Sequence, residues 1–131
     1  QLGRGAFGTV MLGKRRSDNC LVAVKKIPCN ALGDWQEREK CHNEVRLLMQ
    51  MKDPNIIEYV ESFEEEGRFH IVTEYAEYGC LSDLIREKTK KSGDGFSVPE
   101  ALDLLVQVML ALHHVHKMKV IHRDLKPDNI F

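Results

Sequence analysis

The sequence is poor in cysteine: its 131 residues include four, and no two of them form a CxxC pair. Spacing this irregular argues against a disulfide framework or a zinc site, so we expect reduced thiols in an intracellular, cytoplasmic protein. An excess of positive or negative charge is also lacking, because 19 basic and 20 acidic residues leave a formal net charge of -1. Overall charge therefore gives no reason to expect nucleic acid or an anionic membrane as a partner.

Long apolar runs, internal repeats and a basic-then-apolar leader are absent as well. The longest apolar stretch, residues 104–112, is interrupted by Gln107 and is too short to span a bilayer. The chain starts directly against a glycine-rich run and stops at an apolar pair, so we expect it to be cut at both ends. A composition that is 43% hydrophobic and 30% charged fits an ordinary globular domain or part of one.

Residue patterns predict a short list of strands and helices. Apolar, β-branched runs predict strands at residues 9–12, 21–27, 56–63 and 68–75, with a loop at 3–8, a turn at 64–67 and another strand starting at 130. Helical spacing predicts helices at residues 34–51, 81–91 and about 98–118, with Asp34 and Ser97 as N-caps. Strand–helix–strand alternation is missing, so we expect an α+β fold: a mostly antiparallel sheet with one inserted helix, followed by helices.

Two of the predicted helices carry apolar faces. The inserted helix has an inward stripe made of Cys41, Val45, Leu48 and Met51. The last helix is apolar over so much of its surface that we expect it to be buried in a core. On that helix His113 and His116 would share a face that a metal could use, but no acidic or cysteine partner lies nearby at ligand spacing.

The first motif that carries chemistry is a glycine run. Gly3, Gly5 and Gly8 would let backbone N–H groups approach phosphate oxygens, because no Cβ stands in the way. A dinucleotide-binding fingerprint has the same spacing but needs a helix to open at the glycines. The strand predicted after Gly8 favours a hairpin lid, and a glycine-rich hairpin with no ligand is the remaining alternative.

The second motif is a lysine inside an apolar strand, Val22-Ala23-Val24-Lys25. A charge in a half-buried strand is costly unless it is paired. Alternation puts Ala23 and Lys25 on one face and the two valines on the other with Lys26. We expect the valines to face the core beneath the inserted helix and Lys25 to face the glycine loop, although alternation leaves Lys26 open as the functional lysine.

The third motif is a carboxylate on the inserted helix. Of Glu37, Glu39 and Glu44, only Glu44 lies in mid-helix beside the apolar stripe. A carboxylate that points inward needs a cation, and Lys25 is the expected partner. A partly exposed Glu44 paired with Lys40 is the alternative.

The fourth motif is a short loop, residues 122–129, that concentrates ionisable groups. Asp124 could accept a proton from an attacking hydroxyl, and Lys126 could neutralise charge on a transferred phosphoryl group. Asn129 could supply an oxygen to Mg²⁺, a cation that prefers oxygen ligands. A salt-bridged turn without catalytic function is the alternative.

In this order along the whole chain, the motifs resemble those of the protein kinase family. The matching residues are Gly3, Gly5, Gly8 and Val10 of the glycine-rich loop, Lys25 of the strand motif, Glu44 of the helix, and His122, Arg123, Asp124 and Asn129 of the catalytic loop. Residues 58–65 and 37–39 are similar to the NIMA-related Ser/Thr kinases. The resemblance implies a two-lobed kinase fold, with the N-lobe at 1–76 and the start of the C-lobe at 77–131.

The resemblance also implies a function, an ATP- and Mg²⁺-dependent protein Ser/Thr kinase, which is a transferase acting on protein substrates. Lys25 would hold the ATP phosphates and be held by Glu44, Asp124 would be the catalytic base, Lys126 fits the Ser/Thr class, and Asn129 would hold Mg²⁺. The implied adenine contacts are the sandwich of Leu2, Val10, Ala23 and Phe131, the gatekeeper Thr73, and the hinge backbone of Glu74 and Ala76.

The sequence contains no Asp-Phe-Gly and no Ala-Pro-Glu motif. We therefore expect about half of a catalytic domain, inactive on its own, because the Asp-Phe-Gly aspartate is the main Mg²⁺ ligand in the family. The alternative is a pseudokinase or scaffold that binds nucleotide without transferring phosphate. A dinucleotide-dependent oxidoreductase is disfavoured by the strand predicted after Gly8.

Overall fold

A computed structural model describes residues 1–5, 8–28, 35–93 and 95–131, except for the side chains of residues 4, 35–38, 40, 41, 44 and 92. The chain divides into two compact units. The first unit comprises Gln1–Lys52 and Glu58–Tyr75, and the second comprises Asp53–Ile57 and Ala76–Phe131. The predicted lobes at 1–76 and 77–131 remain a prediction.

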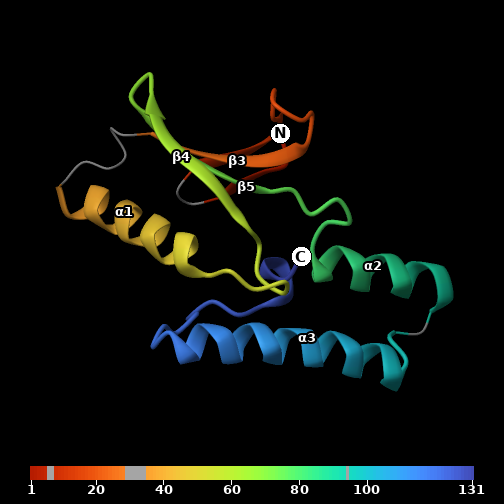
Figure 1. Cartoon of the computed structure of the whole chain (residues 1–131). Coiled ribbons are helices and arrows are strands. Elements are labelled where there is room, and N and C mark those ends of the chain that lie inside the picture. The colour runs from red at the N-terminus through yellow and green to blue at the C-terminus, as the bar shows by residue number, and fades with distance from the viewer. Residues whose placement is uncertain (6–7, 29–34, 94) are drawn as a thin grey trace. The chain divides into compact units, whose positions relative to one another are not determined.

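The first unit is built on a five-stranded antiparallel sheet in the order β1-β2-β3-β5-β4 (Figure 1). Its strands are β1 (Gly3–Gly5), β2 (Gly8–Lys14), β3 (Leu21–Pro28), β4 (Tyr59–Glu65) and β5 (Arg68–Glu74). The predicted α+β class with an antiparallel sheet is confirmed.

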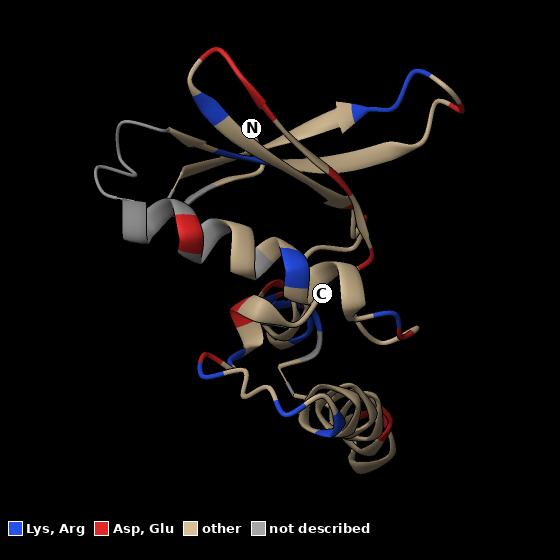
Figure 2. Ribbon diagram, turned by 60° about the vertical axis from the view of Figure 1, so that its left-hand side comes forward, with Lys and Arg blue, Asp and Glu red and all other residues tan. Residues whose placement is uncertain are grey.

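Two turns differ from their predicted extents. Part of the loop predicted at residues 3–8 is strand β1, in which Gly5 pairs with Gly8. Strand β4 runs to Glu65, so the β4–β5 turn contains only Glu66 and Gly67, with φ of 49° and 67°. Positive φ at both positions suits a two-residue hairpin, since it matches the twist of the strands. The acidic residues at this tip are exposed (Figure 2).

Helix α1 (Trp35–Gln50) covers one face of the sheet and closes the core of the first unit (Figure 1). Val45 packs with Ile27, Phe69 and Ile71, and Leu48 and Tyr59 lie against this cluster. The inward stripe is therefore confirmed at Val45 and Leu48, whereas the Cys41 side chain and the predicted N-cap Asp34 lie outside the described residues.

The face of β3 toward α1 is the opposite of the predicted one. Ile27 belongs to the core cluster with Val45. Because side chains alternate along a strand, Lys25 shares the Ile27 face, and Val22 and Val24 lie on the other. The prediction that the valines face the core beneath the helix is wrong, since alternation defines two faces without showing which one a helix covers.

The second unit contains α2 (Leu81–Ser92), α3 (Val98–Lys117) and the short 3-10 helix η1 (Pro127–Asn129). Gly93, with φ 73°, ends α2 by donating its N–H to the Thr89 carbonyl at 3.1 Å. The predicted cap Ser97 begins α3, and its backbone N–H donates to Glu100 Oε2 at 2.9 Å. The strand predicted to start at residue 130 is not formed, because Ile130 instead accepts the Leu81 N–H at 2.7 Å.

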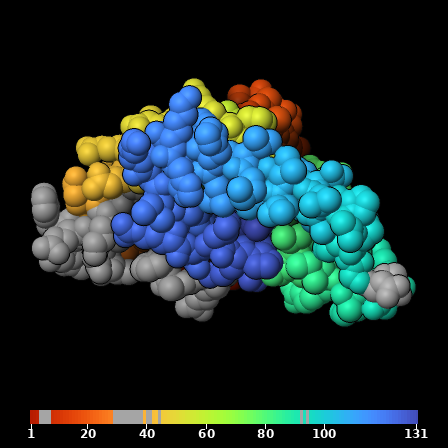
Figure 3. All heavy atoms as spheres, turned by 90° about the horizontal axis from the view of Figure 1, so that it is seen from below, coloured from red at the N-terminus to blue at the C-terminus, as the bar shows by residue number. Residues whose placement is uncertain are grey.

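Helix α3 exposes an apolar face, contrary to the prediction that it is buried in a core. Leu102, Leu105 and Met109 are each more than half exposed, with 53%, 53% and 58% of their surface accessible, whereas Val115 is buried. Side chains of α3 run across the surface in Figure 3. By length and composition alone, this 20-residue helix could also cross a membrane, a test that core helices of water-soluble proteins pass too. The short apolar stretch at residues 104–112 therefore does not exclude a membrane-spanning helix on grounds of length.

Candidate active site

Two predicted catalytic side chains, Asp124 and Lys126, and the predicted Mg²⁺ ligand Asn129 meet in the loop that precedes and includes η1. Lys126 Nζ donates to Asp124 Oδ2 at 2.9 Å, and Asn129 Nδ2 donates to the same oxygen at 2.9 Å. Asn129 Nδ2 also lies 2.8 Å from the Asp124 carbonyl oxygen. Asp124 and Lys126 are exposed, with 65% and 48% of their side chains accessible, so the cluster can be reached from solvent.

Local backbone geometry brings these side chains together. The tight turn of η1 is closed by the Asn129 N–H, which donates to the Lys126 carbonyl at 2.9 Å. Arg123, immediately before Asp124, has a left-handed φ of 66°, a conformation that costs free energy in a non-glycine residue. The bond from Leu81 to Ile130 then ties the end of the loop to the start of α2.

The cluster also determines the charge of its carboxylate. The hydrogen bond from Lys126 lowers the pKa of Asp124 most, followed by the hydrogen bond from Asn129. Both donors stabilise the ionised form, so Asp124 remains a carboxylate to lower pH than an ordinary aspartate. It is therefore suited to accept a hydrogen bond from a hydroxyl group at neutral pH and to orient that group.

Residues predicted to contact nucleotide share one face of the sheet in the first unit. Lys25 stands between Val10 on β2 and Ile71 on β5, and Ala23 stands beside Thr73 on β5. Directly opposed residues in a sheet place their side chains on the same face, as do residues two apart along a strand. The register therefore brings Val10, Ala23, Lys25 and Thr73 to the face that α1 also covers.

Helix α1 includes Glu44, the predicted partner of Lys25. The Glu44 side chain lies outside the described residues, so the pairing with Lys25 stays a prediction. Lys25 itself is half-buried and shares the Ile27 face. Lys26, the alternative candidate for the functional lysine, lies beside His70 on the other face of the sheet.

The glycine run forms the β1–β2 hairpin, and its glycines serve different purposes. A Cβ on Gly8, whose φ is 150°, would collide with the carbonyl oxygen of Lys26. Gly8 is therefore required by the close approach of β3. A Cβ on Gly3 would meet none of the described atoms within 4 Å. The open backbone at Gly3 is thus the part of the hairpin that a ligand can approach.

The predicted hinge begins at Glu74, the last residue of β5, which is held by backbone and side-chain hydrogen bonds. The Glu74 N–H donates to the Glu58 carbonyl at 2.9 Å, and Thr73 Oγ1 donates to the Glu74 carbonyl at 3.2 Å. The Glu58 N–H donates to Glu74 Oε1 at 2.9 Å. Sequence patterns gave no signal for this last contact, because it joins residues 16 positions apart.

The ends of the predicted adenine sandwich are exposed. Leu2, at 43% exposure, donates its N–H to the Val10 carbonyl at 2.8 Å, which places it beside the β1–β2 hairpin. Phe131 is 67% exposed and belongs to the second unit. Ala76, the second hinge residue, is half-buried and also belongs to the second unit.

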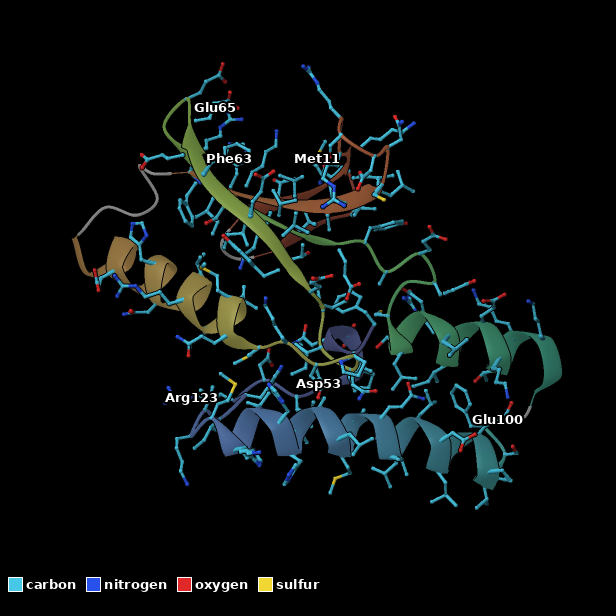
Figure 4. The ribbon with its side chains drawn as sticks, in the orientation of Figure 1. Met11, Asp53, Phe63, Glu65, Glu100 and Arg123 are labelled. Carbon is cyan, nitrogen blue, oxygen red and sulfur yellow. The ribbon has the colours of Figure 1, made fainter. Side chains whose placement is uncertain are left out.

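A half-buried polar pair in the second unit was not predicted from the sequence. His114 Nδ1 lies 3.6 Å from Asp53 Oδ2, and Asp53 Oδ1 accepts two hydrogen bonds from Asn55. Within the described residues, His114 Nε2 is buried without a hydrogen-bond partner. Figure 4 shows Asp53 on the segment near α3. A spacing of 61 residues along the chain carries no recognisable pattern, so only the fold reveals this pair.

Comparison with known proteins places these features in a family. The model of the protein kinase domain matches residues 1–131. Serine/threonine-protein kinase Nek1 of Mus musculus is 41% identical over 131 residues, which are 100% of this chain and 11% of the relative. Nek8 of Danio rerio is 43% identical over 129 residues, which are 98% of this chain and 18% of the relative. Nek5 of Homo sapiens is 41% identical over 130 residues, which are 99% of this chain and 18% of the relative. The chain thus spans less than a fifth of the length of these relatives.

Proposed function

Because the chain belongs to the protein kinase domain family, we propose that the protein transfers the γ-phosphoryl group of ATP to Ser and Thr hydroxyls of protein substrates. Relatives about 40% identical carry the name serine/threonine-protein kinase, which supports the choice of acceptor. Their similarity to this chain also supports membership of the NIMA-related group. An intracellular, cytoplasmic location is part of the proposal and rests on the irregular cysteine spacing.

The observation that carries the proposal is the cluster of Asp124, Lys126 and Asn129. Asp124, kept ionised by its two donors, accepts a hydrogen bond from the substrate hydroxyl and orients it toward the phosphoryl group. The Lys126 ammonium neutralises charge on that group during transfer. Catalysis of this kind depends mainly on positioning and electrostatic stabilisation, for which a preformed cluster is well suited.

Nucleotide would bind against the sheet face that carries Val10, Ala23 and Lys25. Lys25 holds the α- and β-phosphates, and Glu44 on α1 holds Lys25. The adenine ring lies against Val10 and Ala23, with its edge on the backbone of the hinge. The run of Gly3, Gly5 and Gly8 serves as the lid over the phosphates, and the absence of described atoms within 4 Å of a Cβ on Gly3 supports access at that end.

Protein kinases typically use Mg²⁺ together with ATP, and the ion supplies neutralisation of phosphate charge. In this proposal Asn129 is the ligand contributed by the chain. Its Nδ2 is the donor to Asp124, so its oxygen is the atom that suits a hard cation. The described residues contain no group of three His, Cys, Asp or Glu side chains that could hold a metal, so we assign no further protein ligand among them.

Replacing Asp124 tests the proposal most directly. In the full-length protein, Asp124→Asn is expected to reduce phosphoryl transfer at least ~100-fold, because an amide cannot accept the hydroxyl proton. ATP affinity, measured by calorimetry, should stay unchanged. Asp128→Asn is the matched control, since it removes a neighbouring exposed carboxylate of η1 and should retain activity.

The outcomes separate the proposal from its alternative. Unchanged turnover in Asp124→Asn would refute the role given to this carboxylate. A wild-type protein that binds ATP but phosphorylates no Ser- or Thr-containing protein would instead indicate a nucleotide-binding pseudokinase or scaffold.

A further inference from the structure

His70 on β5 is a buried polar side chain on the sheet face opposite to the one that α1 covers. Its strand neighbour Ile71 belongs to the core under α1, so alternation places His70 on the other face, directly beside Lys26 of β3. Only 6% of the His70 surface is accessible. Among the described residues, its imidazole has no hydrogen-bond or ion-pair partner. A buried polar group without a partner costs free energy, so this ring favours a ligand that can hydrogen-bond to it.

The His70 ring lies between two cross-strand neighbours. The Phe63 ring of β4, labelled in Figure 4, stacks on it with 4.8 Å between the ring centroids and 11° between the planes. Lys26 is directly opposed to His70 on the other side, a placement that brings Cβ atoms to about 5 Å. Phe63 is 40% exposed, and Lys26 is half-buried. The row therefore presents an ammonium, an imidazole and an accessible apolar ring side by side.

Charges on this face are divided between its strands. The cations are Lys26 on β3 and Arg68, which is exposed and lies two residues from His70 on β5. Neither cation forms an ion pair within the part of the chain that the structure describes. The acidic residues Glu61 and Glu65 lie on the edge strand β4, and Glu65 opposes Arg68. Two strand spacings, roughly 10 Å, separate Lys26 from β4, which is about the screening length in physiological salt.

We propose that Lys26, His70 and Phe63 form a docking site for an extended acidic peptide segment. A carboxylate or phosphate of the segment lies over Lys26 and His70, and an apolar side chain two residues further along contacts Phe63. Charge complementarity selects this occupant, because an ammonium and an imidazole N–H both donate to an anion, whereas the exposed Phe63 ring favours an apolar partner. Residues two apart in an extended segment are about 6.7 Å apart, which suits the step from the Lys26–His70 pair to Phe63.

The docking site is separate from the proposed nucleotide site. Nucleotide is proposed to bind on the opposite face of the sheet, where Val10, Ala23 and Lys25 lie. The docking site also gives a role to Lys26, which alternation along β3 left open as a functional lysine. Peptide and ATP are therefore expected to bind to the protein at the same time.

Three heptapeptides test the site in the full-length protein. They share the pattern Gly-Ala-X-Ala-Leu-Ala-Gly and differ only at X, which is aspartate, phosphoserine or asparagine. Fluorescence anisotropy of labelled peptides measures the affinities. At least one of the two acidic peptides should bind about tenfold more tightly than the asparagine peptide, because the amide carries no charge for Lys26 to attract. The tighter acidic peptide identifies the anion as a carboxylate or a phosphate.

Two substitutions connect binding to the named side chains. Lys26→Gln removes the charge and keeps most of the stem, and should weaken the acidic peptide about fivefold. His70→Phe keeps a ring beside Phe63 and removes the N–H donor, with a loss of similar size. Lys14→Gln is the matched control, because Lys14 is an exposed lysine of β2 on the opposite face, and peptide affinity should stay unchanged. ATP affinity, measured by calorimetry, should stay unchanged in Lys26→Gln and His70→Phe.

Three results would overturn the proposed site. Equal affinity for all three peptides would show that charge is not recognised, and unchanged affinity of the acidic peptide in Lys26→Gln would show that it binds elsewhere. A parallel loss of ATP and peptide affinity in Lys26→Gln would make Lys26 a nucleotide contact. Thermal unfolding checks that His70→Phe is folded, and if it is not, the exposed-charge variant Lys26→Gln decides the outcome by itself. Failure of phosphoryl transfer would leave these peptide affinities unaffected, so the two proposals fail separately.

Discussion

At the scale of single residues, the catalytic loop shows how neighbouring donors control one carboxylate. Asp124 accepts hydrogen bonds from Lys126 and Asn129, and both contacts lower its pKa. Because the pKa of the carboxyl is lowered, the ionised form is retained as the pH falls through the ordinary aspartate range and is lost only at lower pH. The loop therefore keeps its acceptor charged throughout the neutral range.

The substitution Lys126→Ala tests whether this neighbouring donor lowers the pKa of Asp124. The Lys126 hydrogen bond is the largest cause of the shift, so its removal should raise the pKa of Asp124 toward the ordinary value. The acid limb of kcat/KM against pH should then move to higher pH, in addition to a loss of rate. Carboxyl NMR titration of Asp124 measures the same change directly. Lys91→Ala, which removes a lysine paired with Glu87 on α2, should leave the acid limb in place. An identical acid limb in Lys126→Ala would contradict this account.

At the scale of elements, the β1–β2 hairpin combines a structural glycine with a glycine that leaves room for ligand. Gly8 lies against the Lys26 carbonyl of β3, whereas a Cβ on Gly3 would meet none of the described atoms within 4 Å. The same sequence motif thus serves packing at one end and leaves room for the proposed nucleotide at the other.

Alanine substitutions distinguish the two glycines. Gly8→Ala should destabilise the hairpin by about 2–4 kcal/mol, because the added Cβ meets backbone atoms and φ is unfavourable for an L residue. Gly3→Ala should change local stability by less than ~0.5 kcal/mol. Hydrogen exchange at the β2 and β3 amides of the full-length protein measures both. Equal protection in the two variants would show that the close approach at Gly8 is relaxed in solution.

At the scale of the whole molecule, the chain passes between the two units three times, after Lys52, Ile57 and Tyr75. The first unit has a core formed between α1 and the sheet. In the second unit, α3 buries Val115 but leaves Leu102, Leu105 and Met109 exposed. A continuous exposed apolar face of this kind promotes association in water.

The isolated 131-residue chain is therefore expected to aggregate or to fold incompletely. Sedimentation should show large species, and unfolding should lack a single cooperative transition. The double variant Leu105→Gln and Met109→Gln should raise the soluble fraction, because it interrupts the exposed face. The control substitutes two exposed charged residues, Lys90→Gln and Lys91→Gln, and should not raise the soluble fraction. A monomeric wild-type chain with one sharp transition would refute this expectation.

Contacts between near neighbours in the chain were the most predictable part of the molecule. The catalytic cluster joins residues at most five positions apart, so the sequence already placed these groups in one short loop. The antiparallel sheet followed from the run of strands, and the Val45 and Leu48 positions followed from helical spacing. In each case the relevant period or contact lies within a few residues, where backbone geometry determines it.

Contacts between distant segments were not predictable in this way. Alternation in β3 predicted two faces, but Phe69 and Ile71 on β5 and Val45 on α1 decided that the Ile27 and Lys25 face is the covered one. The Glu58–Glu74 and Asp53–His114 contacts likewise depend on segments that only tertiary packing brings together.

By itself, the sequence determined the kinase motifs, their order and the local chemistry of the Asp124 loop, because those features depend on neighbouring residues. Only the tertiary structure decided which strand face receives Lys25 and which acceptor the Glu58 N–H takes. Those choices depend on burial and hydrogen bonding between strands and helices far apart in the chain, which compete for the same apolar faces and backbone groups.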